Sequence, residues 1–497
     1  MPASGGTASE TVVFEPPGCT AHALIEIDAP RDPLDAFERL RSGHCPWLLD
    51  SALQSPRLGR YSFAGADPYL VLRARGRRIE LDCRRAAYPG LVPGRHVIEE
   101  PVLPTLRRLL PAAPAAASSL PFVGGAVGYL GYELAEQLDV HRLHGRDDLG
   151  LADAVLLFVD SLVAFDHVEG ARWVSAIGHA ATPAQARARA ESAARALVQR
   201  LAAPPAPGAQ RVGTRAHAGL AASRDLDAAA YAKTVDSVKQ EIAAGNVYQA
   251  CLTERVDRPL EADPWTLYQA LRRTNPAPFA SYLELPEVAI VGSSPERFLR
   301  VTADGRVESR PIKGTARRGR HPAEDAALRR ALEDSLKDRA ENLMIVDLVR
   351  NDLGRVCEVG SVEVPELMVI ESYASVYQMV STIRGRLRGE CDVFDLVRAT
   401  FPPGSMTGAP KIAAMRILDE LEPVRRSVYS GALGYFDLRG GADLCVVIRT
   451  ILLSDGRAYL HAGGGIVADS SSADEWQESM DKARLLEAAL EEVGRFK

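Results

Sequence analysis

Lys313 is the residue whose type and setting first suggest chemistry. It lies in the segment Arg310-Pro311-Ile312-Lys313-Gly314-Thr315-Ala316-Arg317-Arg318-Gly319. The proline and the glycines of this segment predict a turn, and glycine lets the backbone approach a ligand closely. A solvated lysine in a surface loop is the other interpretation, so the rest of the chain has to decide between the two.

Acidic residues on two predicted helices are candidates for binding a cation. Glu341 lies in a helix predicted from about 322 to 349 with a bend near 337–338, and Ile345 and Leu348 follow it on the same face. The last helix, which starts near residue 472, carries a second set of charged residues on one face: Glu475, Glu478 and Lys482. An acid at the rim of a core stripe and a solvated charged face are the alternative interpretations of these spacings.

Three further features could bind anions. The glycine- and proline-rich loop 401–411 opens a predicted helix that reaches Glu420, and free N–H groups at a helix start attract anions. The glycines 463–465 directly follow a predicted strand and could turn several N–H groups toward one concavity, although a flexible turn explains them equally well. Arg449 ends the apolar run of another predicted strand.

These features together suit a small polyanionic substrate that is held partly through a divalent metal. Carboxylates from two helices leave several coordination positions for waters and for a substrate carboxylate. Such a site is more typical of Mg²⁺ than of zinc.

The bulk composition limits the partners of the chain. It has 497 residues, of which 46% are hydrophobic and 25% charged, and its net charge of −6 gives no basic surface for nucleic acid or an anionic membrane. Its seven cysteines are scattered without a CxxC pair, so neither disulfides nor a zinc site is indicated. The first residues lack a basic region followed by an apolar run, and no apolar stretch is long enough to span a bilayer, so we expect a soluble, cytoplasmic protein.

Four regions are predicted along the chain. Residues 1–20 form a flexible arm, and 21–202 contain strand-like segments for which antiparallel pairing is expected. Residues 203–223, rich in proline and small residues, are the predicted linker. Residues 224–497 carry the motifs described above and form the predicted catalytic region.

The ordered series of motifs resembles the chorismate-utilising enzymes, a family that includes anthranilate synthase component I, aminodeoxychorismate synthase component I and the isochorismate and salicylate synthases. The resemblance covers about residues 21–490 and rests on six segments: 294–298, 311–315, 341–352, 404–411, 448–450 and 463–470. It implies an α+β fold in which two large antiparallel β-sheets pack as a sandwich with helices outside. The first half of the chain would supply strands to a core that both halves share.

One side chain separates the branches of that family. Anthranilate synthases typically have alanine between Pro-Ile and Gly-Thr, whereas aminodeoxychorismate synthases typically have lysine, as at Lys313. Isochorismate-type members use a lysine to activate water at the position that matches Gln249. This chain has glutamine there, and the absence of the lysine argues against water as the nucleophile. The resemblance therefore implies Mg²⁺-dependent amination of chorismate to 4-amino-4-deoxychorismate, for p-aminobenzoate and folate synthesis. The alternatives are an anthranilate synthase component I and a catalytically inactive ligand sensor.

The resemblance also implies roles for individual residues. Lys313 would form a covalent adduct as the nucleophile, with a pKa lowered by desolvation, by Mg²⁺ and by nearby Arg310. Glu296 would be the general acid for the departing ring hydroxyl, and Glu341 and Glu478 would hold Mg²⁺. The residues implied to bind the substrate are Gly314, Thr315, Thr407, Tyr429, Arg449, Gly463, Gly464, Gly465 and Lys482.

Two partners besides chorismate follow from the resemblance. The sequence contains no Gly-x-Cys-x-Gly segment of the kind that surrounds the nucleophile of glutamine amidotransferases, so ammonia is expected from a separate amidotransferase subunit. Ser51, Pro278 and Phe279 lie in segments that resemble the tryptophan-binding elements of anthranilate synthases with altered residues. Three alternatives stay open: L-tryptophan binds as a structural ligand, it regulates the enzyme, or it does not bind. Tyr377-Gln378 replace a histidine of many relatives and are assigned no role.

Overall fold

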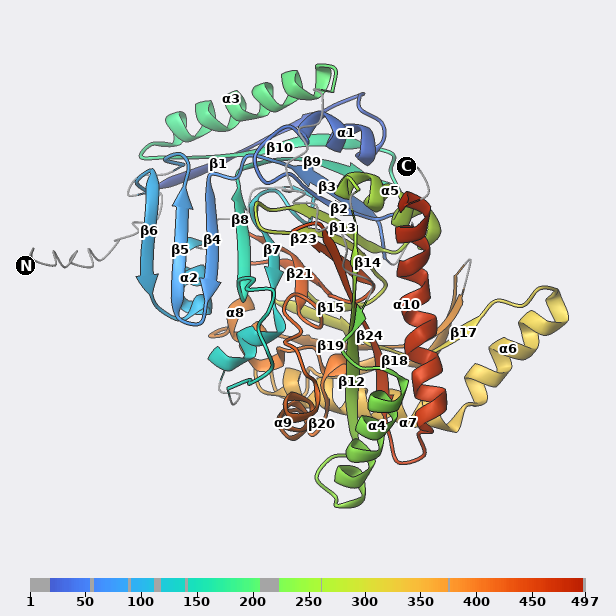
Figure 1. Cartoon of the computed structure of the whole chain (residues 1–497). Helices are drawn as coiled ribbons and strands as arrows, with labels where there is room; N and C mark the ends of the chain where they lie inside the picture. Colours follow the sequence, from blue (N-terminus) through green and yellow to red (C-terminus); the bar gives the residue numbers. More distant parts are fainter. Residues whose placement is uncertain are drawn as a thin grey trace, which may run out of the picture.

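The structure is a computed structural model that describes residues 18–53, 58–87, 91–110, 118–138, 142–205, 223–260, 262–373 and 376–494. Over these residues the strands form two sheets, A and B, of twelve strands each, and neighbouring strands of both sheets run antiparallel (Figure 1). Most of the predicted arm and of the predicted linker lies outside the described residues, at 1–17 and 206–222.

Sheet A contains, in spatial order, β1 (Cys19–Glu26), β10 (Arg172–Ala180), β9 (Ser161–Asp166), β3 (Tyr61–Gly65), β2 (Trp47–Asp50), β13 (Phe279–Glu284), β14 (Ala289–Ser294), β23 (Thr450–Ser454), β24 (Arg457–Ile466), β12 (Gln249–Pro259) and β11 (Ser223–Arg224), with β20 (Gly408–Ala409) paired to β12. Sheet B contains β17 (Ile312–Arg317), β19 (Val376–Arg386), β16 (Arg306–Arg310), β15 (Arg297–Val301), β22 (Ala442–Val446), β21 (Ala432–Asp437), β7 (Gly125–Leu130), β8 (Ala154–Val159), β4 (Leu70–Arg75), β5 (Arg78–Cys83) and β6 (Gly94–Glu99), with β18 (Glu363–Ser372) paired to β19.

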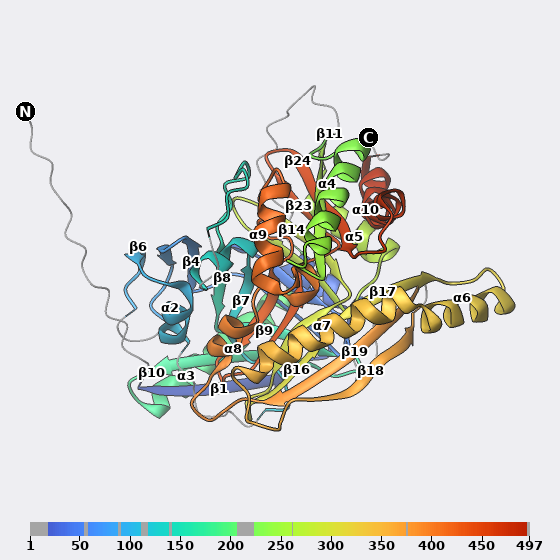
Figure 2. The same cartoon turned by 90° about the horizontal axis from the view of Figure 1, so that it is seen from below.

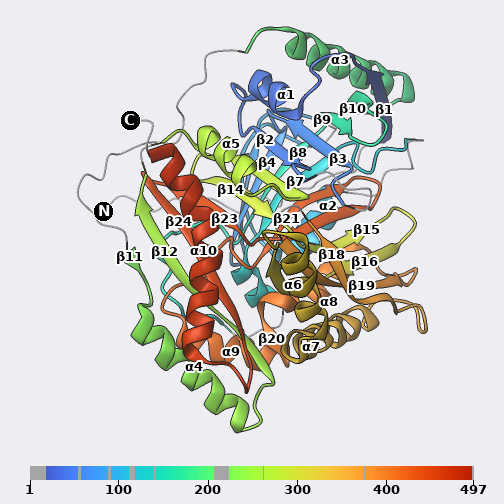
Figure 3. The same cartoon turned by 90° about the vertical axis from the view of Figure 1, so that its right-hand side faces the viewer.

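Helices cover the outer faces of both sheets. They are α1 (Pro33–Leu40), α2 (Val102–Leu109), α3 (Pro183–Ala202), α4 (Ala228–Ala243), α5 (Pro264–Thr274), α6 (Pro322–Asp334), α7 (Leu336–Gly354), α8 (Val393–Thr400), α9 (Lys411–Leu421) and α10 (Ser472–Gly494), with short 3-10 helices η1 (Tyr132–Gln137) and η2 (Gly404–Met406). Helices α1, α3, α5 and α10 share a core with sheet A, and α2, α7 and α8 share one with sheet B (Figures 2 and 3). None of the described helices combines the length and the apolar composition of a membrane span.

The core between the sheets contains aromatic and branched side chains from both of them, among them Phe63, Ile290 and Tyr435. Each sheet also combines strands from the two halves of the chain, because β2 pairs with β13 in sheet A and β7 pairs with β21 in sheet B. The predicted α+β fold of two packed antiparallel sheets with helices outside is therefore confirmed.

Two local predictions from glycine-rich segments are wrong. Residues 312–317 form strand β17 and not a turn. Ile312 pairs with Val380 and Thr315 with Gln378, so two residues of β17, Lys313 and Gly314, lie opposite a single residue of β19. This is a β-bulge, in which Gly314 has a φ of 91°. The glycines 463–465 lie inside β24 and form neither a loop nor a flexible turn. A Cβ on Gly463 would lie 2.0 Å from the carbonyl oxygen of Leu252, so glycine is needed there for close pairing of strands.

Candidate active site

Two charged residues lie where the chain passes from one sheet to the other. Glu296 lies between β14 of sheet A and β15 of sheet B, and Arg449 lies between β22 of sheet B and β23 of sheet A. The two crossings are neighbours, because the Ser293 N–H donates to the carbonyl of Arg449 and the Val446 N–H donates to the carbonyl of Glu296, both at 3.0 Å. Strands of both sheets therefore fix the acid relative to the arginine.

Glu296 lies in a setting that favours its protonated form. The residue is 4% exposed. Burial raises the pKa of Glu296 to about 7, although a hydrogen bond with Ser405 and the charge of Lys313 act in the opposite direction. A carboxyl with a pKa near neutrality can donate a proton at physiological pH, which is the property required of the predicted general acid.

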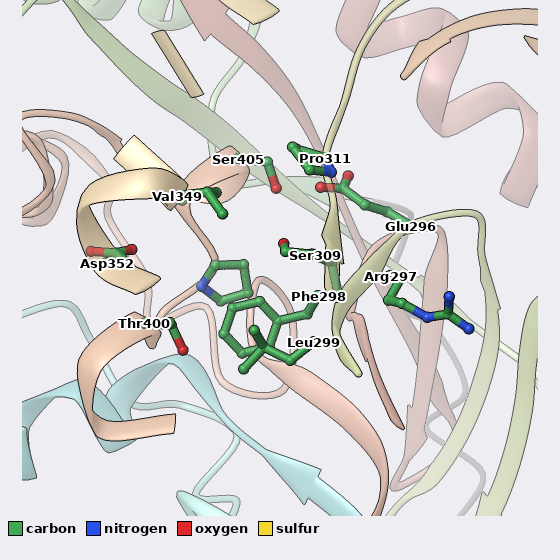
Figure 4. A pocket seen from close by; sticks show the side chains of 13 residues that line it. Glu296, Arg297, Phe298, Leu299, Ser309, Pro311, Val349, Asp352, Thr400 and Ser405 are labelled. Carbon is green, nitrogen blue, oxygen red and sulfur yellow. The ribbon is translucent and has the colours of Figure 1, made fainter. Parts of the chain in front are cut away.

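A small cavity of about 10 Å³ adjoins Glu296 (Figure 4). At one end of it, the carboxylate of Glu296 and the hydroxyl of Ser405 point toward each other, and Asp352 and Thr400 lie at the other end. The cavity is not lined by Lys313 or by the predicted metal-binding acids of α7 and α10. It therefore borders the predicted substrate site at Glu296 without being that site.

Lys313 faces carboxylates from several elements. Its Nζ lies 4.0 Å from Oε2 of Glu341. Burial acts to lower the pKa of Lys313, but the charges of Glu341 and Glu296 outweigh burial, and the pKa is raised. In the chain without metal the pKa of Lys313 is therefore raised, and the lowering predicted from the sequence, which includes Mg²⁺ among its causes, stays a prediction for the metal-bound chain. Arg310, which was predicted to assist that lowering, instead donates to the carboxylate of Glu371 at 2.6 Å.

The carboxylates of Glu341 on α7 and Glu478 on α10 converge on strand β24. A Cβ on Gly465 would lie 3.3 Å from Oε2 of Glu341, and a Cβ on Gly464 would lie 3.4 Å from Oε1 of Glu478. Burial raises the pKa of Glu341, and the charge of Glu478 adds to the increase. Burial acts in the same direction on Glu478, but Lys482 and other lysines outweigh it and lower the pKa of Glu478.

These two carboxylates fit Mg²⁺ better than a metal bound only by protein ligands. Within the ranges that the structure describes, no three His, Cys, Asp or Glu side chains are grouped so as to hold a metal ion. Mg²⁺ commonly takes one or two protein carboxylates and completes its octahedron with waters and substrate oxygens. A side chain on Gly464 would meet the carboxylates of Glu475 and Glu478, whereas a Cβ on Gly465 would lie 2.2 Å from Nε2 of Gln249, which already occupies that position.

Glu475 and Lys337 belong to the same site, although the motifs gave them no role. Oε1 of Glu475 accepts hydrogen bonds from Nζ of Lys337 at 2.8 Å and from Ser470 at 2.7 Å. Its Oε2 is buried without a hydrogen-bond partner and would lie 3.0 Å from a Cβ on Gly464. Glu475 therefore lies beside Glu478 at Gly464, and its ion pair with Lys337 joins α10 to α7. The spacing of Glu475 and Glu478 on one helix face is the sequence signal that could have found it.

The N–H groups of Gly463 and Gly465 point to an open edge of β24. On β12, the N–H groups of Cys251 and Thr253 donate to acceptors outside β24, at 2.8 and 3.0 Å. The glycines opposite them therefore form non-hydrogen-bonded pairs, and their own N–H groups face away from β12. On that side, β23 pairs with β24 only as far as Leu460. Neither neighbouring strand uses these two donors, which leaves them for an anion.

Arg449 is a half-buried cation without a carboxylate partner among the described residues. Burial lowers the pKa of Arg449, and the charge of Glu296 opposes that change. A guanidinium in this setting is suited to pair with a carboxylate of a substrate. Lys482, by contrast, already donates to the carbonyl of Gly463 and to Glu478, each at 2.7 Å.

The other predicted substrate-binding residues border the same strands. Tyr429 is buried and stacks on His461 of β24, with ring centroids 4.7 Å apart. Thr407 is buried, and its carbonyl accepts an N–H of β12. Gly314 lies on the bulge of β17, and Thr315 follows it. The structure thus brings together the residues that the resemblance assigned to one substrate, and their roles stay predictions.

The candidate tryptophan residues lie where β2 ends and β13 begins, in the middle of sheet A. Ser51 is buried, and its hydroxyl donates to the carbonyl of Tyr61 at 2.6 Å. Pro278 is buried, and the half-buried ring of Phe279 lies 5.3 Å from the guanidinium carbon of Arg297. The chain itself uses the hydroxyl donor of Ser51, and binding of L-tryptophan stays a prediction.

Known proteins resemble the chain over nearly its whole length. The family described as chorismate binding enzyme matches residues 94–488. The chain is 43% identical to aminodeoxychorismate synthase of Streptomyces griseus over 92% of this chain and 63% of that protein. It is 37% identical to anthranilate synthase component 1 of Geobacillus stearothermophilus over 94% of this chain and 92% of that protein. The crystal structure of anthranilate synthase component I from Streptococcus pneumoniae TIGR4 superimposes with a TM-score of 0.74 at 29% identity, covering 87% of this chain and 93% of that one.

The match to the first of these relatives is partial in one respect. The chain spans about 63% of the length of the Streptomyces griseus protein. Similarity to that protein therefore bears on the fold and on the site described above, while the activity of the longer protein does not transfer directly.

Proposed function

The chain belongs to the family of chorismate binding enzymes, and from this premise we propose that it is an aminodeoxychorismate synthase component I. It would convert chorismate and ammonia into 4-amino-4-deoxychorismate for p-aminobenzoate and folate synthesis. The observation that carries the proposal is Lys313 on its bulge, 4.0 Å from Glu341 and close enough to Glu296 for their charges to interact. The lysine favours amination, because anthranilate synthases typically have alanine there. The similarity to aminodeoxychorismate synthase supports the same choice.

The proposed reaction has two displacements. The neutral amine of Lys313 forms a C–N bond to the ring carbon next to the carboxylate-bearing carbon, the ring double bonds shift, and the ring hydroxyl leaves as water with the proton of Glu296. Ammonia then forms a bond at the carbon that lost the hydroxyl, the double bonds shift back, and Lys313 leaves. The proton released by the incoming nitrogen restores Glu296, and the enolpyruvyl group is retained.

The proposed substrate contacts are distributed around β24. The N–H groups of Gly463 and Gly465 and the guanidinium of Arg449 would bind carboxylates, because neighbouring strands and carboxylates leave them free. The remaining contacts would come from Gly464, Gly314, Thr315, Thr407, Tyr429 and Lys482. These groups hold the ring with its hydroxyl toward Glu296 and its neighbouring carbon toward Lys313.

We also propose that Glu341 and Glu478 hold Mg²⁺. The proposal is supported by the approach of the two carboxylates to neighbouring glycines of β24 and by the effect of the charge of Glu478 on the pKa of Glu341. When bound, Mg²⁺ would supply positive charge for the ring carboxylate of chorismate and would offset the carboxylates that raise the pKa of Lys313. Desolvation would then favour the neutral amine that the reaction needs.

Removing either proposed ligand should weaken Mg²⁺ binding. We expect Glu341→Gln and Glu478→Gln each to raise the half-saturating Mg²⁺ concentration by about tenfold or more, since each removes a charged oxygen ligand. Calorimetric titration with Mg²⁺ and activity against Mg²⁺ concentration both measure this change. Glu487→Gln is the matched control, because Glu487 also lies on α10 but pairs with Arg258 at 2.6 Å. An unchanged Mg²⁺ titration in both ligand variants would refute the assignment.

The proposed ammonia source is a separate glutamine amidotransferase subunit. The relative from Geobacillus stearothermophilus is named component 1, which implies a second component in that enzyme. Binding of L-tryptophan near Ser51, Pro278 and Phe279 is a further proposal that rests on resemblance. A cytoplasmic location likewise stays a prediction from composition.

Product analysis tests the proposed function. With chorismate, Mg²⁺ and ammonium, the wild-type chain should form 4-amino-4-deoxychorismate, and chromatography separates this product from anthranilate. Anthranilate with pyruvate would instead identify an anthranilate synthase component I, the second candidate that the similarity to such enzymes favours. Absence of turnover at saturating ammonium would support an inactive ligand sensor.

A further inference from the structure

Arg426 is a fully buried arginine that lies between segments of the proposed substrate site. It is 2% exposed and lies between α9 and β21. Burial acts to lower its pKa, but Glu422 outweighs burial and raises the pKa of Arg426, so the side chain stays charged. The charged pair Arg426–Glu422 is 2.6 Å apart, and its cation lies 4.7 Å from the ring centroid of Tyr132.

All the donor positions of the guanidinium are used. Nε and Nη2 donate to the two carboxylate oxygens of Glu422, at 2.7 and 2.6 Å. Nη2 also donates to the carbonyl of Cys251 at 2.7 Å, and Nη1 donates to the carbonyl of Met406 at 2.7 Å and to the hydroxyl of Ser430 at 3.3 Å. These bonds account for the five N–H donors of an arginine, and a lysine has only three.

Each of these acceptors adjoins a residue that we propose to contact the substrate. Met406 directly precedes Thr407, and Ser430 directly follows Tyr429. Cys251 lies opposite Gly465 in the pairing of β12 with β24. Arg426 therefore ties together three separate segments: the η2 loop, the start of β12 and the turn before β21.

Glu422 extends the same connection along β12. Its Oε1 accepts hydrogen bonds from both the N–H and the hydroxyl of Thr253, at 3.0 Å each. Thr253 lies opposite Gly463. Glu422 thus satisfies the N–H of Thr253 that faces away from β24, which supports the pairing in which the N–H of Gly463 faces the open edge.

We propose that Arg426, through its pair with Glu422, is a positioning residue that sets the carboxylate-binding side of the substrate site. This inference rests on the proposed function, because it acts on the residues assigned there to chorismate. Arg426 touches none of the proposed reacting groups, Lys313 and Glu296. Its effect should therefore fall on the binding of chorismate and not on the chemical steps.

The variant Arg426→Lys tests this role, because it retains the charge but loses the planar fork and two donors. We expect the KM for chorismate to rise by about tenfold to a hundredfold, as carbonyls and N–H groups next to the substrate shift. The kcat should change by less than about threefold, and the KM for ammonium should stay unchanged. Calorimetric binding of chorismate in the presence of Mg²⁺ should show the same loss of affinity.

Arg255→Lys is the matched control. Arg255 is 5% exposed, and its guanidinium donates, at 2.8 and 2.5 Å, to both oxygens of Asp148, a residue that has no assigned role at the proposed substrate site. We expect it to lose thermal stability without a change in the KM for chorismate. If Arg426→Lys does not fold, Glu422→Gln provides the same comparison, because it removes the charge of the pair but keeps an acceptor for Thr253.

The possible outcomes separate this inference from the proposed function. An unchanged KM in Arg426→Lys, or an equal rise in KM in Arg255→Lys, would overturn the positioning role whatever the product is. If the wild type instead makes anthranilate, the proposed function fails, but the comparison of KM values still decides the role of Arg426. If the wild type shows no turnover, the comparison of chorismate affinities decides it.

Discussion

Lys313→Ala should lose amination of chorismate by about a thousandfold or more, because it removes the proposed nucleophile while leaving the carboxylates that surround it. Chorismate should still bind, since the groups assigned to its carboxylates are unchanged. The measurement is the rate of 4-amino-4-deoxychorismate formation with ammonium as the nitrogen donor. Mass spectrometry of the acid-quenched protein provides a second readout, in which only the wild type should carry a chorismate adduct that has lost water.

The matched control for this variant is Lys233→Ala. Lys233 is an exposed lysine of α4, so its replacement should leave both the rate and the adduct as they are in the wild type. A fully active Lys313→Ala variant would contradict the covalent mechanism. A fall in the rate with the adduct still present would mean that another residue is the nucleophile.

Glu296→Gln should lower kcat by about 10²- to 10⁴-fold, the range expected when a general acid is removed. Glutamine keeps the size of the side chain and a hydrogen-bonding group for Ser405, so the variant isolates the loss of the proton. The pH dependence gives a sharper test. Burial raises the pKa of Glu296 to about 7, and the acid must be protonated to act. The wild-type kcat should therefore fall as the pH rises through about 7, and the remaining activity of Glu296→Gln should lack that fall.

Glu133 offers a matched control for the pH profile. Burial also raises the pKa of Glu133 to about 7, although its carboxylate accepts the N–H of Arg426 and lies away from Lys313. Glu133→Gln should retain the alkaline fall at the same pH as the wild type. If the fall disappears in Glu133→Gln and persists in Glu296→Gln, the assignment of the general acid is wrong.

The sequence predicted the fold through family resemblance and not through local patterns. The residues 310–319 form a turn pattern, because proline and glycine interrupt the run of residues that a strand would need. The structure places the same residues in β17, where the glycine allows a bulge. Glycine permits a positive φ in a turn and in a bulge alike, so the residue types identify the glycine but not the strand that pairs with it.

The sequence predicted individual residues of the site but not how their charges act on one another. The motifs identified Glu296, Lys313 and Glu341 one by one, and the structure brings their charges together. What the motifs could not give is the balance of those charges. The pKa of Lys313 depends on how many carboxylates face it across three elements, and that number follows from the packing of α7 and α10 on the sheets. The link between Glu475 and Lys337 depends on the same packing.

The interleaving of the two sheets has a consequence for synthesis of the chain. On a ribosome, β2 and β7 emerge long before their partners β13 and β21. About 300 residues separate β7 from β21, so at about 5–20 residues per second the first waits roughly 15–60 s for the second. Unpaired strand edges readily pair with other chains during such an interval. The first half therefore exposes unpaired strand edges during this interval, and Glu296 and Arg449 become neighbours only near the end of translation.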